Sequence, residues 1–351
     1  MKNKDTQKKT AFAMGGLAGN NAHGGGFLQA AMEKNEEPVI ISCTSGQIFW
    51  VYNYLKVKKT TKNLEGIFEE DIKKASPTNN TNWDNWNLAL FGRRDIYRPA
   101  YYEFQRDLCN NMVKSYQKVM QNPHETNYLD ALCRVIPSRT LVPLFPDNFF
   151  DNISETFNMS DIGIVFNSYN PKNGTEYIHL NDKAQEILGV NYNTRGSYRE
   201  RTEYKRITQE SVRQALWIYQ YGFDRDRIVF DGAYFRQIML SELVPADKIY
   251  VVRPVNYRWI GNLPECYIGV EDLKTETSFN GTYAGERDKI KLINKLIRDN
   301  CFTKKMISEK NYHEIELVEI EIDTQEGFFD YINEKMSVFK NAKEKSLSYL
   351  P

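Results

Sequence analysis

The 351-residue chain is predicted to be an α/β protein, because segments typical of strands and of helices alternate through both of its ends. Short apolar runs rich in β-branched residues mark the strands, and longer mixed runs mark the helices. With 41% hydrophobic residues, the chain has ample material for a sizeable core. We therefore expect helices layered against a sheet in one large domain, residues 1–351.

The N-terminal part is expected to contain two strands, each followed by a helix. Residues 10–14 predict a short strand, and after a glycine-rich loop a helix is expected at about 27–34. Pro38 introduces the apolar run VIIS, which has the length and the β-branching of a buried strand. Ser45 and the glycine after it end this strand, and QIFWVYNYLKV (47–57) is expected to be helical.

The rest of the chain adds an insertion, a hairpin and a C-terminal extension. Residues 57–152 are polar and helical in pattern, which predicts a helical insertion or cap within the domain. The run at 160–180 has two strand-like segments around a Pro-Lys-Asn-Gly turn, which is typical of a β-hairpin. A helical run at 211–223 precedes two apolar strand-like runs, RIVF and KIYVVR. Residues 285–351 are expected to form a helix-strand-helix extension.

Composition excludes several classes of function. Lys plus Arg and Asp plus Glu both number 46, so no global charge recruits nucleic acid, and no nucleic-acid partner is expected. Five cysteines without a CxxC pair and four dispersed histidines predict neither a disulfide framework nor a zinc site. The N-terminal lysines superficially resemble a signal peptide, but glycines stand where a secretory segment has leucines. We therefore expect a reducing, cytoplasmic location.

Ser45 lies where a nucleophile elbow would place its serine, on a tight turn between a buried strand and a helix. Such a turn exposes the hydroxyl, and the helix N-terminus, starting with the amide of Gly46, can stabilise an oxyanion. The elbow motif G-x-S-x-G has glycines where this chain has Cys43 and Gln47. The alternative interpretation of Ser45 is an ordinary helix N-cap.

Two further segments supply the groups that such a serine needs. The run AMGGLAGNNAHGGG (13–26) holds six of the 20 glycines, but it matches neither a P-loop nor a dinucleotide fingerprint, so no cofactor is expected. It is interpreted as a loop whose backbone amides are bare for an anion. Asp231 ends the run RIVF, and Gly232 follows it, which places a carboxylate on a tight turn. A plain Asp-Gly turn is the alternative.

Together the three pieces resemble the patatin-like phospholipase family. GGLAGNNAH resembles the family's glycine-rich oxyanion loop, SCTSGQ resembles its elbow, and Asp231-Gly232-Ala233 is similar to its D-G-[GA] motif. VPADKIYVVRP looks like the strand that follows the aspartate motif. The resemblance covers roughly residues 10–55 and 155–255. It implies a three-layer α/β/α sandwich with a mainly parallel central sheet.

The resemblance also implies roles for the site residues. Ser45 would be the nucleophile and Asp231 its base, with no metal or cofactor. The oxyanion hole would be made by the amides of Gly15, Gly16, Leu17 and Gly46. His23, which trails the loop, would be structural. The family usually has a basic residue at the position of Gly19. In this chain, further electrostatic stabilisation of the oxyanion would therefore come from backbone amides, or from Asn20 or Asn21. The auxiliary candidates are Gly19, Asn20, Gln47 and Gly232.

The expected function is hydrolysis of a lipid acyl ester, of the phospholipase A or lysophospholipase type. One alternative is a thioesterase or short-chain esterase on the same Ser-Asp dyad. Another, motivated by the departures at Gly19, Cys43 and Gln47, is a catalytically impaired module that binds lipid. Two features leave a peripheral membrane contact open: the pair Trp83 and Trp86, and a helix with Ile290, Ile293 and Ile297 on one face. For each of the two, packing onto the rest of the protein is the favoured interpretation. The sequence leaves the oligomeric state open.

Overall fold

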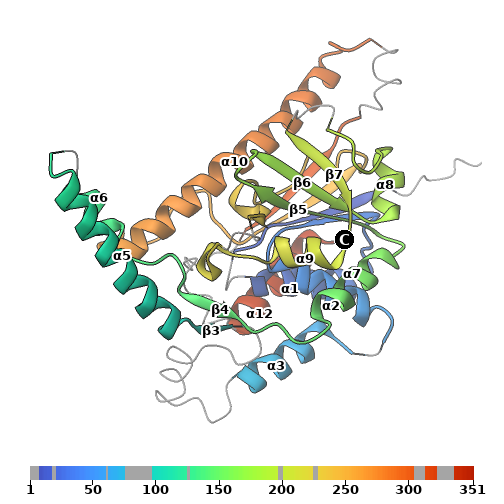
Figure 1. Cartoon of the computed structure of the whole chain (residues 1–351). Coiled ribbons are helices and arrows are strands. Elements are labelled where there is room, and N and C mark those ends of the chain that lie inside the picture. The colour runs from blue at the N-terminus through green and yellow to red at the C-terminus, as the bar shows by residue number, and fades with distance from the viewer. Residues whose placement is uncertain are drawn as a thin grey trace, which may run out of the picture. The chain divides into compact units, whose positions relative to one another are not determined.

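An eight-stranded, mainly parallel β-sheet lies at the centre of the computed structural model (Figure 1). The structure describes residues 8–17, 21–60, 62–75, 97–124, 127–196, 201–223, 228–303, 313–321 and 336–351. The strand order is β10-β9-β1-β2-β5-β6-β7, and β8 pairs with β5. The strands are β1 (Thr10–Met14), β2 (Ile40–Cys43), β5 (Gly163–Asn170), β6 (Thr175–Leu180), β7 (Thr202–Arg206), β8 (Phe230–Asp231), β9 (Lys248–Arg253) and β10 (Glu316–Glu321).

The five strands from β10 to β5 run parallel, with β1 in the middle. Met14 at the end of β1 pairs with Cys43 of β2 on one side and with Val252 of β9 on the other. The carboxyl ends of these three strands therefore meet at one edge of the sheet, which is where parallel α/β sheets usually bind their ligands.

Both faces of the sheet are covered, because each central strand is buried on both sides. On one face, Phe12 of β1 packs edge-on against Phe27 of α1 (Ala22–Glu33), with the ring centroids 4.8 Å apart. On the other face, Ala11 and Ala13 lie in a buried apolar cluster with Tyr283 and Ile290 of α10 (Tyr267–Arg298). The prediction of a mixed α/β protein with a mainly parallel sheet is confirmed.

Several elements lie where the sequence predicted them. Strand β1 and helix α2 (Gln47–Val57) match the expected ranges. β5 and β6 form the expected antiparallel hairpin, and Gly174 in its turn has a φ of +69°. Ile290 is 2% exposed within the core cluster, in agreement with the interpretation that its helix packs onto the sheet.

Helix α1 begins at Ala22, five residues before the expected start, and so includes the three consecutive glycines of the glycine-rich run. Glycine is needed at these helical positions because the neighbouring residues approach too closely for a side chain. A Cβ on Gly25 would lie 2.6 Å from the Trp50 ring of α2. A Cβ on Gly26 would lie 2.1 Å from the carbonyl oxygen of Phe339 in α12 (Met336–Tyr349).

Helix α9 (Gln209–Ala215) is shorter than the expected 211–223, and α10 is longer than expected. After the end of α9, the indole of Trp217 donates to the carbonyl oxygen of Gly222, whose φ is +79°. In the C-terminal region, β10 pairs with β9. Helix α12 packs on α1, as Figure 1 shows. The described parts of residues 285–351 thus belong to the central sheet and to the helices that cover it.

The chain divides into two compact units. The first contains the central sheet and comprises Met1–Asp71, Phe150–Leu216 and Val229–Pro351, and the second comprises Ile72–Phe149 and Trp217–Ile228. Helix α3 (Leu64–Ala75) spans the boundary, and α7 (Phe149–Asn158) and α8 (Asp182–Leu188) belong mainly or wholly to the first unit. The second unit contains α5 (Tyr101–Gln121), α6 (Tyr128–Cys133) and the antiparallel pair β3 (Tyr97–Pro99) and β4 (Leu141–Pro143). It overlaps the predicted insertion, and it also includes 217–228, which the sequence did not associate with that insertion. Trp83 and Trp86 lie outside the described residues.

None of the helices in the described part of the chain combines the length and the apolar character that crossing a membrane requires.

Candidate active site

Ser45 lies on a tight turn between the end of β2 and the start of α2. Its φ is +54°, in the left-handed region that a residue with a Cβ rarely adopts. The amide of Ile48 donates to the carbonyl oxygen of Ser45, so α2 begins directly at this turn. A strained strand-to-helix turn that carries a serine has the geometry of a nucleophile elbow.

Ser45 does not cap the helix. The N-cap residue of α2 is Gly46, and no side chain caps this end of the helix. The Ser45 hydroxyl instead hydrogen-bonds the Asp231 carboxyl. The N-cap interpretation is therefore wrong, and the structure brings together the two residues that the sequence predicted as a dyad.

Asp231 ends the short strand β8, where it lies opposite Ser168 of β5. Its carboxyl is 1% exposed, and it also accepts a hydrogen bond of 2.9 Å from the amide of Ala233. Burial raises the pKa of Asp231 to about 7, while the hydrogen bonds from Ser45 and Ala233 act in the opposite direction. A carboxylate with this pKa can accept a proton from a neighbouring hydroxyl near neutral pH.

Gly232 has a packing role in the turn that holds Asp231. A Cβ at this position would lie 2.3 Å from the Asn167 carboxamide. The Asn167 side chain donates to the carbonyl oxygens of Gly232 and Arg236, each at 3.3 Å. The Asp-Gly turn is thus fixed to the middle of β5.

The amides of the glycine loop are not bare, and the expectation that they are is wrong at three positions. Gly15 donates to the carbonyl oxygen of Val252 at 3.0 Å, Gly16 donates to Thr44 Oγ1 at 2.9 Å, and Leu17 donates to Asn21 Oδ1 at 3.2 Å. The physical reason is burial, because a buried amide needs an acceptor and the loop lies against the ends of β9 and β2.

The amide of Gly46, by contrast, donates to no other residue in the described part of the chain. It lies at the positive end of α2, directly after Ser45. Of the four amides predicted to form the oxyanion hole, it is the one without a protein acceptor among the described residues.

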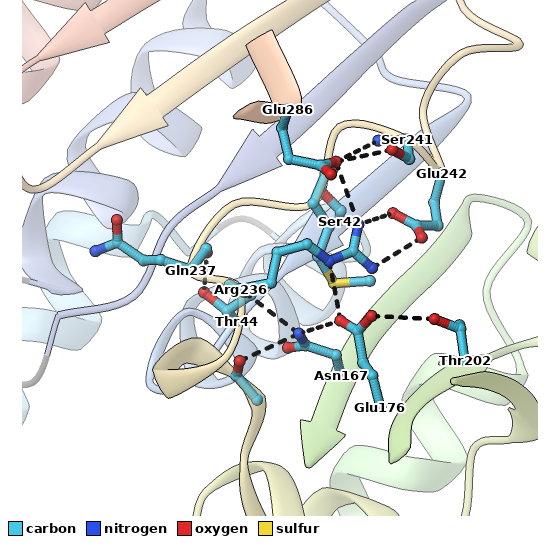
Figure 2. A network of polar contacts seen from close by, with 12 residues as sticks. Ser42, Thr44, Asn167, Glu176, Thr202, Arg236, Gln237, Ser241, Glu242 and Glu286 are labelled. Atoms are coloured by element: carbon cyan, nitrogen blue, oxygen red, sulfur yellow. Dashed lines mark hydrogen bonds and ion pairs between the residues drawn. The ribbon is translucent and has the colours of Figure 1, made fainter. Parts of the chain in front are cut away.

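Gly16 allows the loop to contact the elbow. A Cβ at Gly16 would lie 2.4 Å from the carbonyl oxygen of Thr44 and 2.6 Å from Ser45 Cβ. Gln237 then fixes the Gly16 peptide, since Gln237 Nε2 donates to the Gly16 carbonyl oxygen at 2.9 Å. Thr44 Oγ1 donates to the Gln237 carbonyl oxygen at 2.6 Å (Figure 2). The loop, the elbow and the segment after Asp231 are therefore joined directly.

Arg236, next to Gln237, anchors that segment in the core. Figure 2 shows its guanidinium among the carboxylates of Glu176, Glu242 and Glu286, with N···O distances of 2.9, 2.7 and 3.3 Å. These side chains are at most 5% exposed. Glu176 lies on β6 and Glu286 on α10, so the cluster connects the Asp231 segment to both. Sequence reasoning missed Arg236 and Gln237, because nothing local distinguishes them from surface residues.

Gln47 occupies an elbow-glycine position without crowding Ser45. Its buried side chain donates to the carbonyl oxygen of Asn21 at 3.1 Å. A Cβ on Gly24 of helix α1 would lie only 2.0 Å from Gln47 Oε1. The space for Gln47 is thus made by the glycine of the facing helix. Cys43 is fully buried, and burial raises the pKa of its thiol, which opposes a role as a nucleophile.

Two auxiliary candidates, Gly19 and Asn20, lie outside the described residues. His23 is 1% exposed within α1. The described residues contain no group of three or more side chains suited to holding a metal ion.

No model of a known protein family matches the chain, and no curated protein matches it in sequence. The class defined by the fold is that of α/β proteins with a mainly parallel central sheet. The chemistry must therefore be argued from the Ser45-Asp231 pair and its surroundings.

Proposed function

We propose that this protein is a serine hydrolase of patatin-like, three-layer α/β/α architecture that cleaves the acyl esters of lipids, of the phospholipase A or lysophospholipase type. The observation that carries the proposal is the hydrogen bond between Ser45, held at a φ of +54°, and the buried Asp231. The resemblance of the loop, elbow and aspartate motifs to patatin-like phospholipases supports a lipid as the substrate. The proposed partner is thus a phospholipid or lysophospholipid, reached by peripheral contact with its surface.

In the proposed mechanism, Asp231 takes the proton of the Ser45 hydroxyl as Ser45 Oγ attacks the ester carbonyl carbon. The carbonyl oxygen becomes an oxyanion beside the amide of Gly46 and the positive end of α2. The bond to the alcohol then breaks, and the alcohol leaves with the proton from Asp231. Water, activated by the same carboxylate, hydrolyses the acyl-enzyme.

We propose a cytoplasmic location, because all five cysteines are free and four of them are exposed. Exposed thiols persist in reducing compartments.

A second candidate function is a lipid-binding module without turnover. The observation that favours it is that the amides of Gly15, Gly16 and Leu17 already have protein acceptors. A thioesterase or short-chain esterase would use the same dyad and differ only in substrate.

The test compares the wild type with Ser45→Ala on vesicles of mixed phospholipids, on an acyl thioester and on a short p-nitrophenyl ester, measuring fatty acid or alcohol release. We expect release from phospholipid by the wild type and a fall of at least about 10³-fold in Ser45→Ala, since the nucleophile is lost. Ser168→Ala is the matched control, because Ser168 is also a buried serine and lies opposite Asp231 in the sheet. The Ser168 hydroxyl contacts His179 Nε2 at 2.8 Å.

Equal release by the wild type and Ser45→Ala would contradict the role of Ser45. Lipid binding without release from any of the three substrates would support the binding module instead.

A further inference from the structure

Two hydroxyl residues, Ser42 and Thr44, lie in and directly after β2, where a buried parallel strand usually has only apolar side chains. Each is 1% exposed. Ser42 Oγ donates to the carbonyl oxygen of Met239 at 2.8 Å, and Thr44 Oγ1 donates to that of Gln237 at 2.6 Å (Figure 2). Alternate residues of an extended chain point to the same side, so both hydroxyls bind the segment that follows Asp231.

These two bonds lie where the backbone pairing between the neighbouring strands has ended. The last residue pair between β2 and β5 is Ser42 and Val165. Asp231 of β8 pairs with Ser168, which lies further along β5, and Ser45 lies beyond the end of β2. The pairing of β2 with β5 therefore stops before it reaches either member of the dyad, and the hydroxyls join the two sides instead.

The segment that the hydroxyls bind is directly connected to the catalytic carboxyl. The Gly232 carbonyl oxygen accepts from the amide of Arg236 at 2.8 Å, which closes a turn between Asp231 and Gln237. Because a turn closed in this way moves as a unit, a shift of Gln237 would change where the Asp231 carboxyl lies relative to Ser45.

We propose that Ser42 and Thr44 are positioning residues, which hold the segment after Asp231 so that the Asp231 carboxyl stays hydrogen-bonded to Ser45; this inference rests on the proposed function. Transfer of the Ser45 proton requires its oxygen and the carboxylate to lie within about 2.6–3.2 Å of each other. Both hydroxyls are buried and bonded to backbone, so they act through Asp231 and not by contact with the substrate.

The test measures kcat and KM on a short p-nitrophenyl ester, and the rate at which a fluorophosphonate labels Ser45. Ser42→Ala and Thr44→Val each remove a hydroxyl and nearly keep the shape of the side chain. Each should lower kcat and the labelling rate about fivefold with little change in KM, because misplacing a reacting group costs rate and not affinity.

Two further variants show whether the hydroxyl groups themselves are responsible. Thr44→Ser keeps the hydroxyl and should recover most of the rate that Thr44→Val loses. Ser346→Ala removes a hydroxyl that is equally buried, in α12, where it donates to the carbonyl oxygen of Ala342 at 2.6 Å. It should match the wild type in kcat, KM and labelling.

A double-mutant cycle with Asp231→Asn separates positioning of Asp231 from a general weakening of the elbow. If Ser42 acts through Asp231, Ser42→Ala should slow labelling little further once Asp231→Asn is present. Ser42 gives the cleaner cycle, because Thr44 Oγ1 also accepts from the Gly16 amide. Thermal unfolding shows whether each variant is folded at the assay temperature, and either hydroxyl variant serves if the other is not.

Wild-type rates in both Ser42→Ala and Thr44→Val would overturn the inference and leave the proposed function standing. The same conclusion would follow if Ser42→Ala slowed labelling by the same factor with and without Asp231. A wild type that neither hydrolyses an ester nor is labelled at Ser45 would overturn both.

Discussion

At the scale of single residues, the site depends on a strained serine and a buried carboxyl. A left-handed conformation costs a residue with a Cβ roughly 1–2 kcal/mol, so the surrounding contacts must hold Ser45 at its φ of +54°. The position of Ser45 at the end of a strand, and of Asp231 before a glycine, could be predicted, because both have local signatures. Their pairing was implied only by the family resemblance, because no local signal joins residues so far apart in the chain.

The pKa of Asp231 predicts how activity depends on pH. Burial raises this pKa to about 7, and only the deprotonated carboxylate can accept the serine proton. The value of kcat/KM should therefore rise as the pH increases from 5 to 8, with a midpoint near 7, and then level off. In Asp231→Asn activity should be low throughout and this transition should disappear. A wild-type profile that is flat from pH 5 to 8 would rule out Asp231 as the base.

At the scale of elements, the glycine run has a structural meaning that its sequence alone did not reveal. It begins as a loop and continues as the first turns of α1. Gly16 permits contact with the elbow, and Gly24 makes room for Gln47. The sequence predicted bare backbone amides in this region, and it did not predict this close packing. The long-range partners of the loop backbone were unpredictable: Val252, which accepts from the Gly15 amide, and Gln237, which donates to the Gly16 carbonyl oxygen, come from segments more than 200 residues away.

Gly16→Ala tests this contact. The added Cβ would lie 2.4 Å from the backbone oxygen of Thr44, which cannot move without displacing Ser45. We expect turnover to fall at least tenfold and the midpoint of thermal unfolding to decrease. Gly281→Ala in α10 is the control, since no atom lies within 4 Å of its new Cβ, and alanine in a helix interior should stabilise by about 0.5–1 kcal/mol. Normal turnover in Gly16→Ala would mean that the loop does not constrain the elbow.

At the scale of the whole molecule, the site is held together by polar contacts between distant segments. The central sheet brings the ends of β1, β2 and β9 to one edge, and the Arg236 cluster fixes the segment after Asp231 to β6 and α10. Strand and helix alternation predicted the layers. It could not predict a buried guanidinium with three carboxylates, because one arginine among 46 basic residues carries no mark of burial.

Arg236→Met tests the contribution of this cluster to stability. Removing the guanidinium leaves buried carboxylates without their cation, which typically costs about 3–5 kcal/mol. Arg206→Met, which breaks an exposed pair with Asp182, should cost only about 0–1 kcal/mol. Chemical denaturation of both variants at neutral pH gives the comparison. Similar losses for the two variants would show that the buried cluster is not a major stabilising element.

The central claim is that Ser45 is a nucleophile activated by Asp231. Mass spectrometry of peptides from protein treated with a fluorophosphonate measures this directly, without knowledge of the natural lipid. We predict one phosphonyl adduct on Ser45, at least tenfold slower labelling of Asp231→Asn, and normal labelling of Ser168→Ala. An unmodified Ser45, or equal labelling rates in the wild type and Asp231→Asn, would contradict the account.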